Sequence, residues 1–186
     1  MRHLIKLTAL SAVALLSINS CSTIDSDLIV EPPTVTSQLS ESISRLSVQD
    51  KRPHSYLYRH IDSDSQKANQ FSAPSQPLTE IVKQAFQQSG IVSGQGDLNW
   101  YISINKAVVE HTETTLKYQL DYQLNIRVEA QRMNRSYART FTGTSKSEGV
   151  SNPDEATIER EFKRLLQQVL NDIANDPQLR LMETRG

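Results

Sequence analysis

Residues 116–131 read LKYQLDYQLNIRVEAQ, and the alternation in this stretch decides the fold. Every even position is apolar or aromatic, and every odd position is polar or charged. Because successive side chains of a β-strand point to opposite faces, the stretch predicts a strand with one face on a hydrophobic core and the other in water. Such a strand belongs to an antiparallel or mixed sheet that is covered on one side only.

Two neighbouring segments predict the strands that pair with it. Residues 98–104 alternate in the same way, and residues 137–144 follow a short polar turn at residues 132–135. Strands that are joined by short turns pair antiparallel. The three strands are therefore expected to form an antiparallel meander.

The alternation of the first of these strands breaks at Lys106, just before Ala107 and Val109. A β-bulge at this place would turn Ala107 and Val109 toward the core. Without a bulge, an odd-numbered loop such as residues 111–115 is needed to bring the apolar faces of the two strands together.

Two amphipathic helices are predicted to cover the sheet. The first follows Pro77, runs for about thirteen residues and ends at Gly90. The second opens at Asn152, with a proline next and a glutamate three residues on, as in a capping box, and ends at Asp176-Pro177. Each helix has one narrow apolar stripe, so both are expected to lie on the same face of the sheet.

Two short strands are predicted upstream, over residues 43–49 and 55–61, with a weaker candidate at residues 69–72. The expected fold is therefore α+β: a mainly antiparallel sheet with two amphipathic helices packed on one face, in the order β-β-α-β-β-β-α.

The first twenty residues predict an export signal. Arg2 and Lys6 precede an uncharged apolar run over residues 7–18, which is too short to cross a bilayer of about 30 Å. The following Ile18-Asn19-Ser20-Cys21 resembles the bacterial lipobox. This resemblance implies that residues 1–20 are removed and that Cys21 becomes the acylated first residue. The alternative is an ordinary secretory signal with a chance cysteine.

The lipobox resemblance also implies a location. In such lipoproteins an aspartate after the cysteine typically retains the protein in the inner membrane, and here the residue is Ser22. We therefore expect an outer-membrane lipoprotein on the periplasmic face. Residues 21–40 are expected to hold the acylated cysteine and a tether with a candidate short strand at residues 28–31, and residues 41–186 a single α+β domain.

Charge excludes some partners. Loss of the two basic residues of the signal leaves 18 basic against 21 acidic residues, a net charge of −3. The acyl chains on Cys21 rather than electrostatics are therefore expected to hold the protein on the membrane. The same balance argues against a nucleic-acid partner.

Several features together resemble the YajG-like family of small proteobacterial lipoproteins over nearly the whole chain. They are the lipobox, an early strand that ends in Val48-Gln49-Asp50-Lys51-Arg52, one helix, a three-strand meander and a closing helix. The resemblance implies the fold and an envelope location, and it carries over no catalytic residue. Accessory lipoproteins of envelope transport machines have related architectures, which is an analogy of fold alone.

The sequence contains neither a Gly-x-Ser-x-Gly nor a His-Glu-x-x-His motif, so we expect no enzymatic activity and no cofactor. His54, His60, Asp62 and Asp64 form a local group of metal-ligand residue types. Polar residues at strand ends in water explain this group as well, and we expect no metal. A hydrolase or metalloenzyme would require His60, Asp62 or Asp64 to meet distant carboxylates or His111 in a cleft.

These patterns favour a non-catalytic interaction or accessory protein whose partner is an unknown envelope protein. Asp50 and Arg52 have two open roles: they bind a charged group of that partner, or they pin the turn in which they lie. The alternative function is a lipid- or small-ligand-binding module of an envelope transport system. That function needs an apolar cavity between the helices and the sheet.

Overall fold

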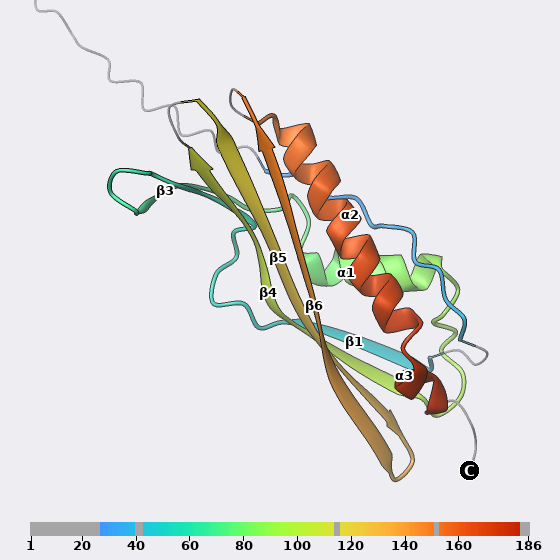
Figure 1. The fold of residues 1–186 in the computed structure, drawn as a ribbon. Helices are drawn as coiled ribbons and strands as arrows, with labels where there is room; N and C mark the ends of the chain where they lie inside the picture. Colours follow the sequence, from blue (N-terminus) through green and yellow to red (C-terminus); the bar gives the residue numbers. More distant parts are fainter. Residues whose placement is uncertain (1–26, 40–42, 114–115, 151–152, 183–186) are drawn as a thin grey trace, which may run out of the picture.

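The computed structural model describes residues 27–39, 43–113, 116–150 and 153–182. The expected signal peptide, Cys21 and Ser22 lie outside these residues. The described chain forms a mixed six-stranded sheet with helices on one face (Figure 1). Its elements are β1 (Arg45–Asp50), β2 (Tyr58–Ile61), β3 (Ala68–Ser72), α1 (Leu78–Gln88), β4 (Asn99–Glu113), β5 (Tyr118–Arg132), β6 (Arg135–Gly149), α2 (Glu155–Ala174) and α3 (Pro177–Leu181).

The predicted α+β fold and its order of elements are confirmed, with the short β3 and α3 added. The three long strands β4, β5 and β6 form the expected antiparallel meander. β1 and β2 both pair with β4 in parallel, β1 along its first half and β2 along its last residues. A strand of 15 residues is long enough for two short strands to share one of its edges. β3 then closes this side of the sheet by pairing antiparallel with β2.

Of the two alternatives for this strand, the structure has the bulge, which separates the two pairings. The register of β4 against β5 shifts between Ile104 and Lys106. Beyond the shift, Ala107 and Val109 are buried, as the bulge predicts. The bulge therefore keeps one continuous apolar face along the whole length of β4.

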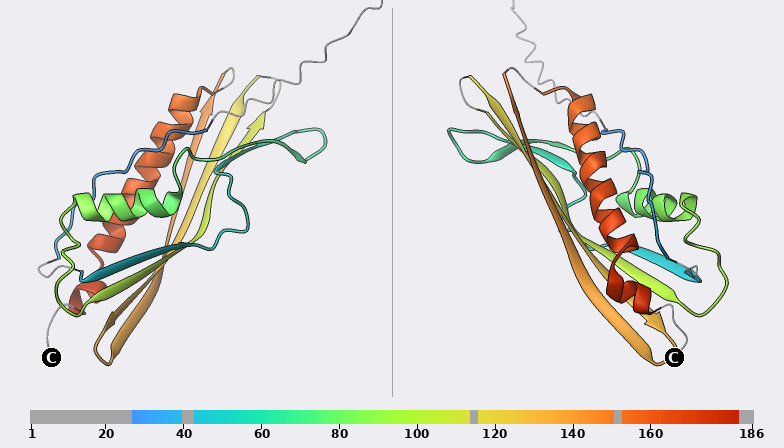
Figure 2. Two further views of the ribbon diagram at one scale, coloured as in Figure 1. Left: turned by 180° about the vertical axis from the view of Figure 1, so that it is seen from behind. Right: turned by 45° about the vertical axis from the view of Figure 1, so that its right-hand side comes forward.

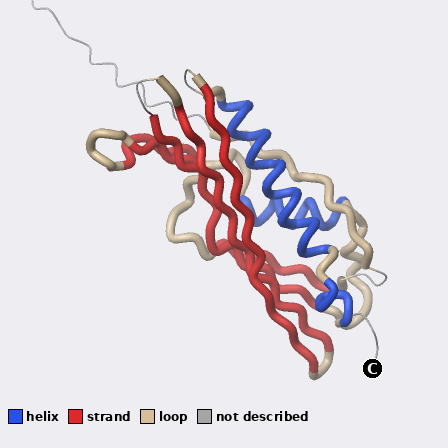
Figure 3. The backbone as a smooth tube through the Cα atoms, in the orientation of Figure 1, coloured by secondary structure: helices blue, strands red, loops and turns tan. Residues whose placement is uncertain are grey.

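Both helices pack on that face, as expected (Figure 2). α2 lies along β5 and β6, and α1 lies over β1 (Figure 3). The indole of Trp100 on β4 meets the Phe86 ring of α1 edge-on, with centroids 5.9 Å apart. Gly143 on β6 allows α2 to pack close to this strand, because a Cβ there would lie 2.6 Å from Cγ2 of Val169 on α2. Side chains of both helices and of the sheet thus form one core.

The ends of the last helix differ from the prediction. The N-cap is Asp154, whose carboxylate accepts a hydrogen bond from the Thr157 backbone N–H at 2.7 Å. The expected cap, Asn152, lies outside the described residues. Asp176 and Pro177 do not merely end α2: the Asp176 carboxylate caps the short helix α3, and Pro177 is its first residue. Proline is well suited to that position because its missing N–H would have no partner there.

Residues 28–39, which we expected to belong to the tether, pack against α2. Val30 and Val35 are buried in the core, and the backbone N–H of Thr36 donates to the Asn171 side chain at 2.8 Å. The candidate strand at residues 28–31 is reduced to one bridge between Leu28 and Pro74. Residues 28–39 are therefore packed on the α+β domain, although they precede the expected boundary at residue 41.

Candidate functional site

Arg52 lies in the loop that joins β1 to β2. Its Nη2 lies 2.8 Å from Oδ2 of Asp50, and its Nε lies 3.0 Å from Oδ1. Nη1 donates to the backbone carbonyl of Tyr56 at 3.0 Å and to that of Ala107 at 3.4 Å. Only 5% of the Arg52 side chain is exposed. The side chain thus fastens the loop to β4, just beyond the bulge.

These contacts determine the protonation of Asp50. Burial acts to raise the pKa of the Asp50 carboxyl, but the hydrogen bonds and the charge of Arg52 outweigh burial and lower this pKa. Because all three guanidinium nitrogens of Arg52 are engaged within the chain, the contacts are those of a pair that pins its turn.

Replacement of Arg52 by alanine is expected to lower the free energy of unfolding at pH 7 by about 1–3 kcal/mol, because loop carbonyls and a carboxylate lose their donors. Since the pKa of Asp50 is lower in the folded state, the pair stabilises the protein fully above about pH 4 and loses this effect as pH falls through the folded-state pKa. Urea denaturation of R52A and wild type at pH 7 and pH 3 measures both effects.

The matched control is Arg127→Ala, because Arg127 is exposed on β5. Its effect should stay within about 0.5 kcal/mol at either pH. An equal loss in both variants, or a deficit of R52A that is unchanged at pH 3, would contradict the pinning role.

The pinned loop carries an aromatic surface. His54 stacks on Tyr56 with ring centroids 4.9 Å apart, and Tyr56 contacts Phe71 of β3 at 4.8 Å. Phe71 is 46% exposed. His54 and Tyr56 also line a pocket of about 220 Å³, whose apolar walls include Ala107 and Val108. We call these three rings and the adjoining hollow the aromatic pocket.

The four side chains of the local ligand group do not meet in the structure. His54 lies in the aromatic pocket, and Asp62 accepts hydrogen bonds from backbone N–H groups in the turn between β2 and β3. His60 lies instead beside His111 and Glu113, which come from β4. The parallel register places His60 directly opposite His111.

The sequence indicates part of the cluster formed by His60, His111 and Glu113. His111 and Glu113 are two residues apart on a strand and therefore share a face. The sequence does not show that β2 pairs with this end of β4, so it does not indicate that His60 joins them. A metal site required His60 to meet His111 or a distant carboxylate. The structure brings His60 next to both His111 and the carboxylate of Glu113.

The layer between the helices and the sheet is filled by side chains. Trp100, Tyr122, Phe86 and Phe162 are the largest of the fully buried residues there. This packing argues against a lipid-carrying cavity in the middle of the layer. Two pockets near β2 lie at the margins of the sheet. One is part of the aromatic pocket, and the other lies beside His60 and His111.

A family model described as "Uncharacterized lipoprotein" (Lipoprotein_16) matches residues 30–182. The chain belongs to this family. Membership makes the protein a membrane-anchored lipoprotein of the cell envelope. Among the described residues, no helix is long and apolar enough to cross a membrane. No curated protein is significantly similar to the chain in sequence.

Solved structures show that the fold of this family member occurs elsewhere. A Xanthomonas campestris protein, XCC0632, is 16% identical, with a TM-score of 0.54 over 78% of this chain and 89% of that one. This similarity shows a shared fold alone. The lipoprotein GNA1162 of Neisseria meningitidis is 13% identical, with a TM-score of 0.24 over 69% of this chain and 98% of that one. That TM-score is too low to indicate a shared fold.

Proposed function

We propose that this protein is a YajG-like lipoprotein that acyl chains on Cys21 anchor to the periplasmic face of the outer membrane, where it binds another envelope protein without catalysing a reaction. Family membership supports the anchor. The observation that supports the interaction role is the aromatic pocket, which a buried arginine holds in place.

The start of the described chain gives this anchored protein an orientation. Leu28 lies in one pocket lining with Glu113 at the end of β4 and Glu155 at the start of α2. The end of β4 and the start of α2 lie at the same end of the sheet (Figure 1). Residue 27 is six residues from Cys21, and six residues span at most about 21 Å. Anchoring therefore brings this end of the sheet close to the membrane. The exposed side chain of Leu116, two residues before β5 begins, is at the same end.

The aromatic pocket has the chemistry of a protein-binding surface. Rigid, partly exposed aromatic side chains next to a hollow contribute much of the binding energy at protein interfaces. They lose little conformational freedom on binding, because Arg52 already fixes the loop that carries His54 and Tyr56. Arg59 and Glu110 at the rim form an ion pair, so the rim is polar, as in typical interfaces.

Photo-crosslinking in intact cells tests the interaction role. A benzophenone amino acid at Phe71 is expected to give one discrete adduct with an envelope protein. The matched control places the same amino acid at Thr144, which is exposed on the open face of β6. This position should give no such adduct.

A second variant separates the pocket from general proximity. Tyr56→Ala removes the ring between His54 and Phe71 and should remove the Phe71 adduct while the protein stays on the membrane. The interaction role would be refuted by the absence of any adduct at Phe71, by the same adduct at Thr144, or by an adduct that persists with Tyr56→Ala.

A further inference from the structure

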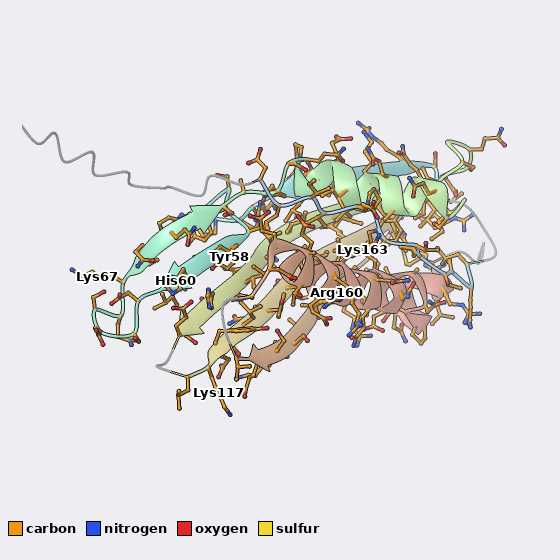
Figure 4. All side chains as sticks on the ribbon, turned by 90° about the horizontal axis from the view of Figure 1, so that it is seen from above. Tyr58, His60, Lys67, Lys117, Arg160 and Lys163 are labelled. Carbon is orange, nitrogen blue, oxygen red and sulfur yellow. The ribbon has the colours of Figure 1, made fainter. Side chains whose placement is uncertain are left out.

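A second group of side chains lies outside the aromatic pocket, at the end of the sheet. It consists of His60 on β2 and His111 and Glu113 on β4. One ligand atom of each residue lies within 4.8 Å of the ligand atoms of the other two. Figure 4 shows His60 and its neighbour Tyr58 on β2. The interaction proposed at the aromatic pocket does not involve these three side chains, so their proximity is not explained by it.

His111 is buried, and one of its nitrogens has no hydrogen-bond partner among the described residues. The side chain is 4% exposed, and Nε2 makes no hydrogen bond within the described part of the chain. The nearest Glu113 oxygen lies 3.4 Å from this nitrogen. Buried polar atoms without a hydrogen bond are rare in folded proteins and often mark an ion or ligand position.

The hydrogen bond of His60 determines which of its nitrogens is free. Nδ1 lies 2.9 Å from the Asn69 side-chain oxygen. When Nδ1–H donates to this oxygen, the lone pair lies on Nε2 and is directed away from Asn69. Nε2 is buried and makes no hydrogen bond within the described residues. It lies 3.9 Å from Oε2 of Glu113. A lone pair and a carboxylate repel each other unless a cation lies between them.

Tyr58 orients His111 in the same way. The Tyr58 hydroxyl lies 2.6 Å from Nδ1 of His111. When Nδ1–H donates to this oxygen, Nε2 has a free lone pair, which is the usual second-shell arrangement of a metal-bound histidine.

We propose that His60, His111 and Glu113 bind a divalent transition-metal ion of the zinc type through the two Nε2 atoms and the carboxylate. Two imidazoles and one carboxylate suit Zn²⁺ and its neighbours, whereas Mg²⁺ and Ca²⁺ prefer oxygen ligands. Three protein ligands leave a fourth position of a tetrahedral ion open.

The three proposed ligands line a pocket. A hollow of about 280 Å³ is lined by the three ligands together with Tyr58, Gln70, Ser72 and Glu155. Water or a small anionic group can reach the ion from this side. The site stands independently of the anchor and of the partner at the aromatic pocket, so failure of either proposal leaves the other intact.

Metal titration of the purified mature protein tests the site. The acylated chain is kept in detergent, carries no polyhistidine tag and is stripped with chelator before Zn²⁺ is added. Calorimetry should show one ion per chain, and saturation with about 100 times the dissociation constant should raise the thermal midpoint by roughly 5 °C. Mg²⁺ at the same concentration should do neither. Co²⁺ should give visible absorption bands of a nitrogen- and oxygen-ligated ion.

Variants assign the ligands. His60→Asn and Glu113→Gln retain much of the side-chain shape at partly exposed positions, and each should weaken Zn²⁺ binding by more than about 100-fold. Tyr58→Phe removes a positioning hydroxyl and should weaken binding by about 10-fold or more. Asp64→Asn is the matched control, because Asp64 is an exposed carboxylate near His60 in sequence that is not one of the three ligands.

The outcomes separate clearly. Stoichiometric Zn²⁺ binding that His60→Asn and Glu113→Gln abolish, and Asp64→Asn does not, would establish the site. Absence of saturable binding, equal binding of Mg²⁺, or binding that persists in both ligand variants would overturn it. Circular dichroism of each variant without metal shows that the fold is retained.

Discussion

Replacement of Cys21 by alanine is expected to move essentially all of the exported protein from the membrane fraction to the soluble periplasm. A buried acyl chain contributes about 0.8 kcal/mol per methylene, and two or more chains hold a protein durably on a bilayer. The chain without them has a net charge of −3 after loss of the signal, so it has no electrostatic attraction to anionic lipids. Fractionation and fatty-acid labelling measure the effect.

The signal sequence must be controlled in this experiment. Without the cysteine, uncleaved residues 1–20 could themselves hold the chain on the membrane, so C21A is made behind a secretory signal that is cleaved independently of acylation. Ser22→Asp is the companion variant, which should remain acylated but move to the inner membrane. Full membrane retention of C21A, or no labelling of the wild type, would contradict the anchor.

Replacement of Trp100 by alanine is expected to lower the free energy of unfolding by about 3–5 kcal/mol. Trp100 is fully buried and is the largest side chain in the core. Its removal loses the transfer free energy of the indole, leaves a cavity against Phe86 and weakens the attachment of α1 to β4. Because many domains have a total stability of only 5–15 kcal/mol, this change alone brings the protein close to unfolding. Urea denaturation measures it.

The adjacent residue is the matched control. Tyr101 points to the open face of the same strand and is 37% exposed. Tyr101→Ala should therefore cost less than about 1 kcal/mol, from lost contacts across the strand. A similar loss for Trp100→Ala and Tyr101→Ala would show that the sheet is covered on both faces and would refute the one-sided architecture.

Local sequence pattern was sufficient for the elements with strong periodicity. The alternation of residues 116–131 predicted β5 and its buried face, and the break at Lys106 marked the place where β4 has its bulge. Both main helices were predicted from their apolar spacing and end signals. Each of these features depends on residues that are close in the chain, where side-chain direction follows directly from backbone geometry.

Pairing in parallel could not be predicted from the same patterns. β1 and β2 are short, and no turn connects either of them to β4, so nothing local specifies their partner or register. The packing of residues 28–39 on α2 was missed for the same reason. Its hydrogen bonds to α2 join residues that are 130 or more positions apart, such as Thr36 and Asn171.

The functional residues also divide into those that are close in the chain and those that only strand pairing brings together. The sequence by itself placed Asp50 and Arg52 two residues apart in a turn, where their side chains can meet without any distant strand, and it singled out Cys21 through its position after the predicted signal. Only the tertiary structure decided that His60 faces His111 and Glu113 and that Phe71 completes the aromatic pocket. The physical reason is that the register between β2 and its neighbours is set by packing of the whole sheet on one core, and no short stretch of residues contains that information.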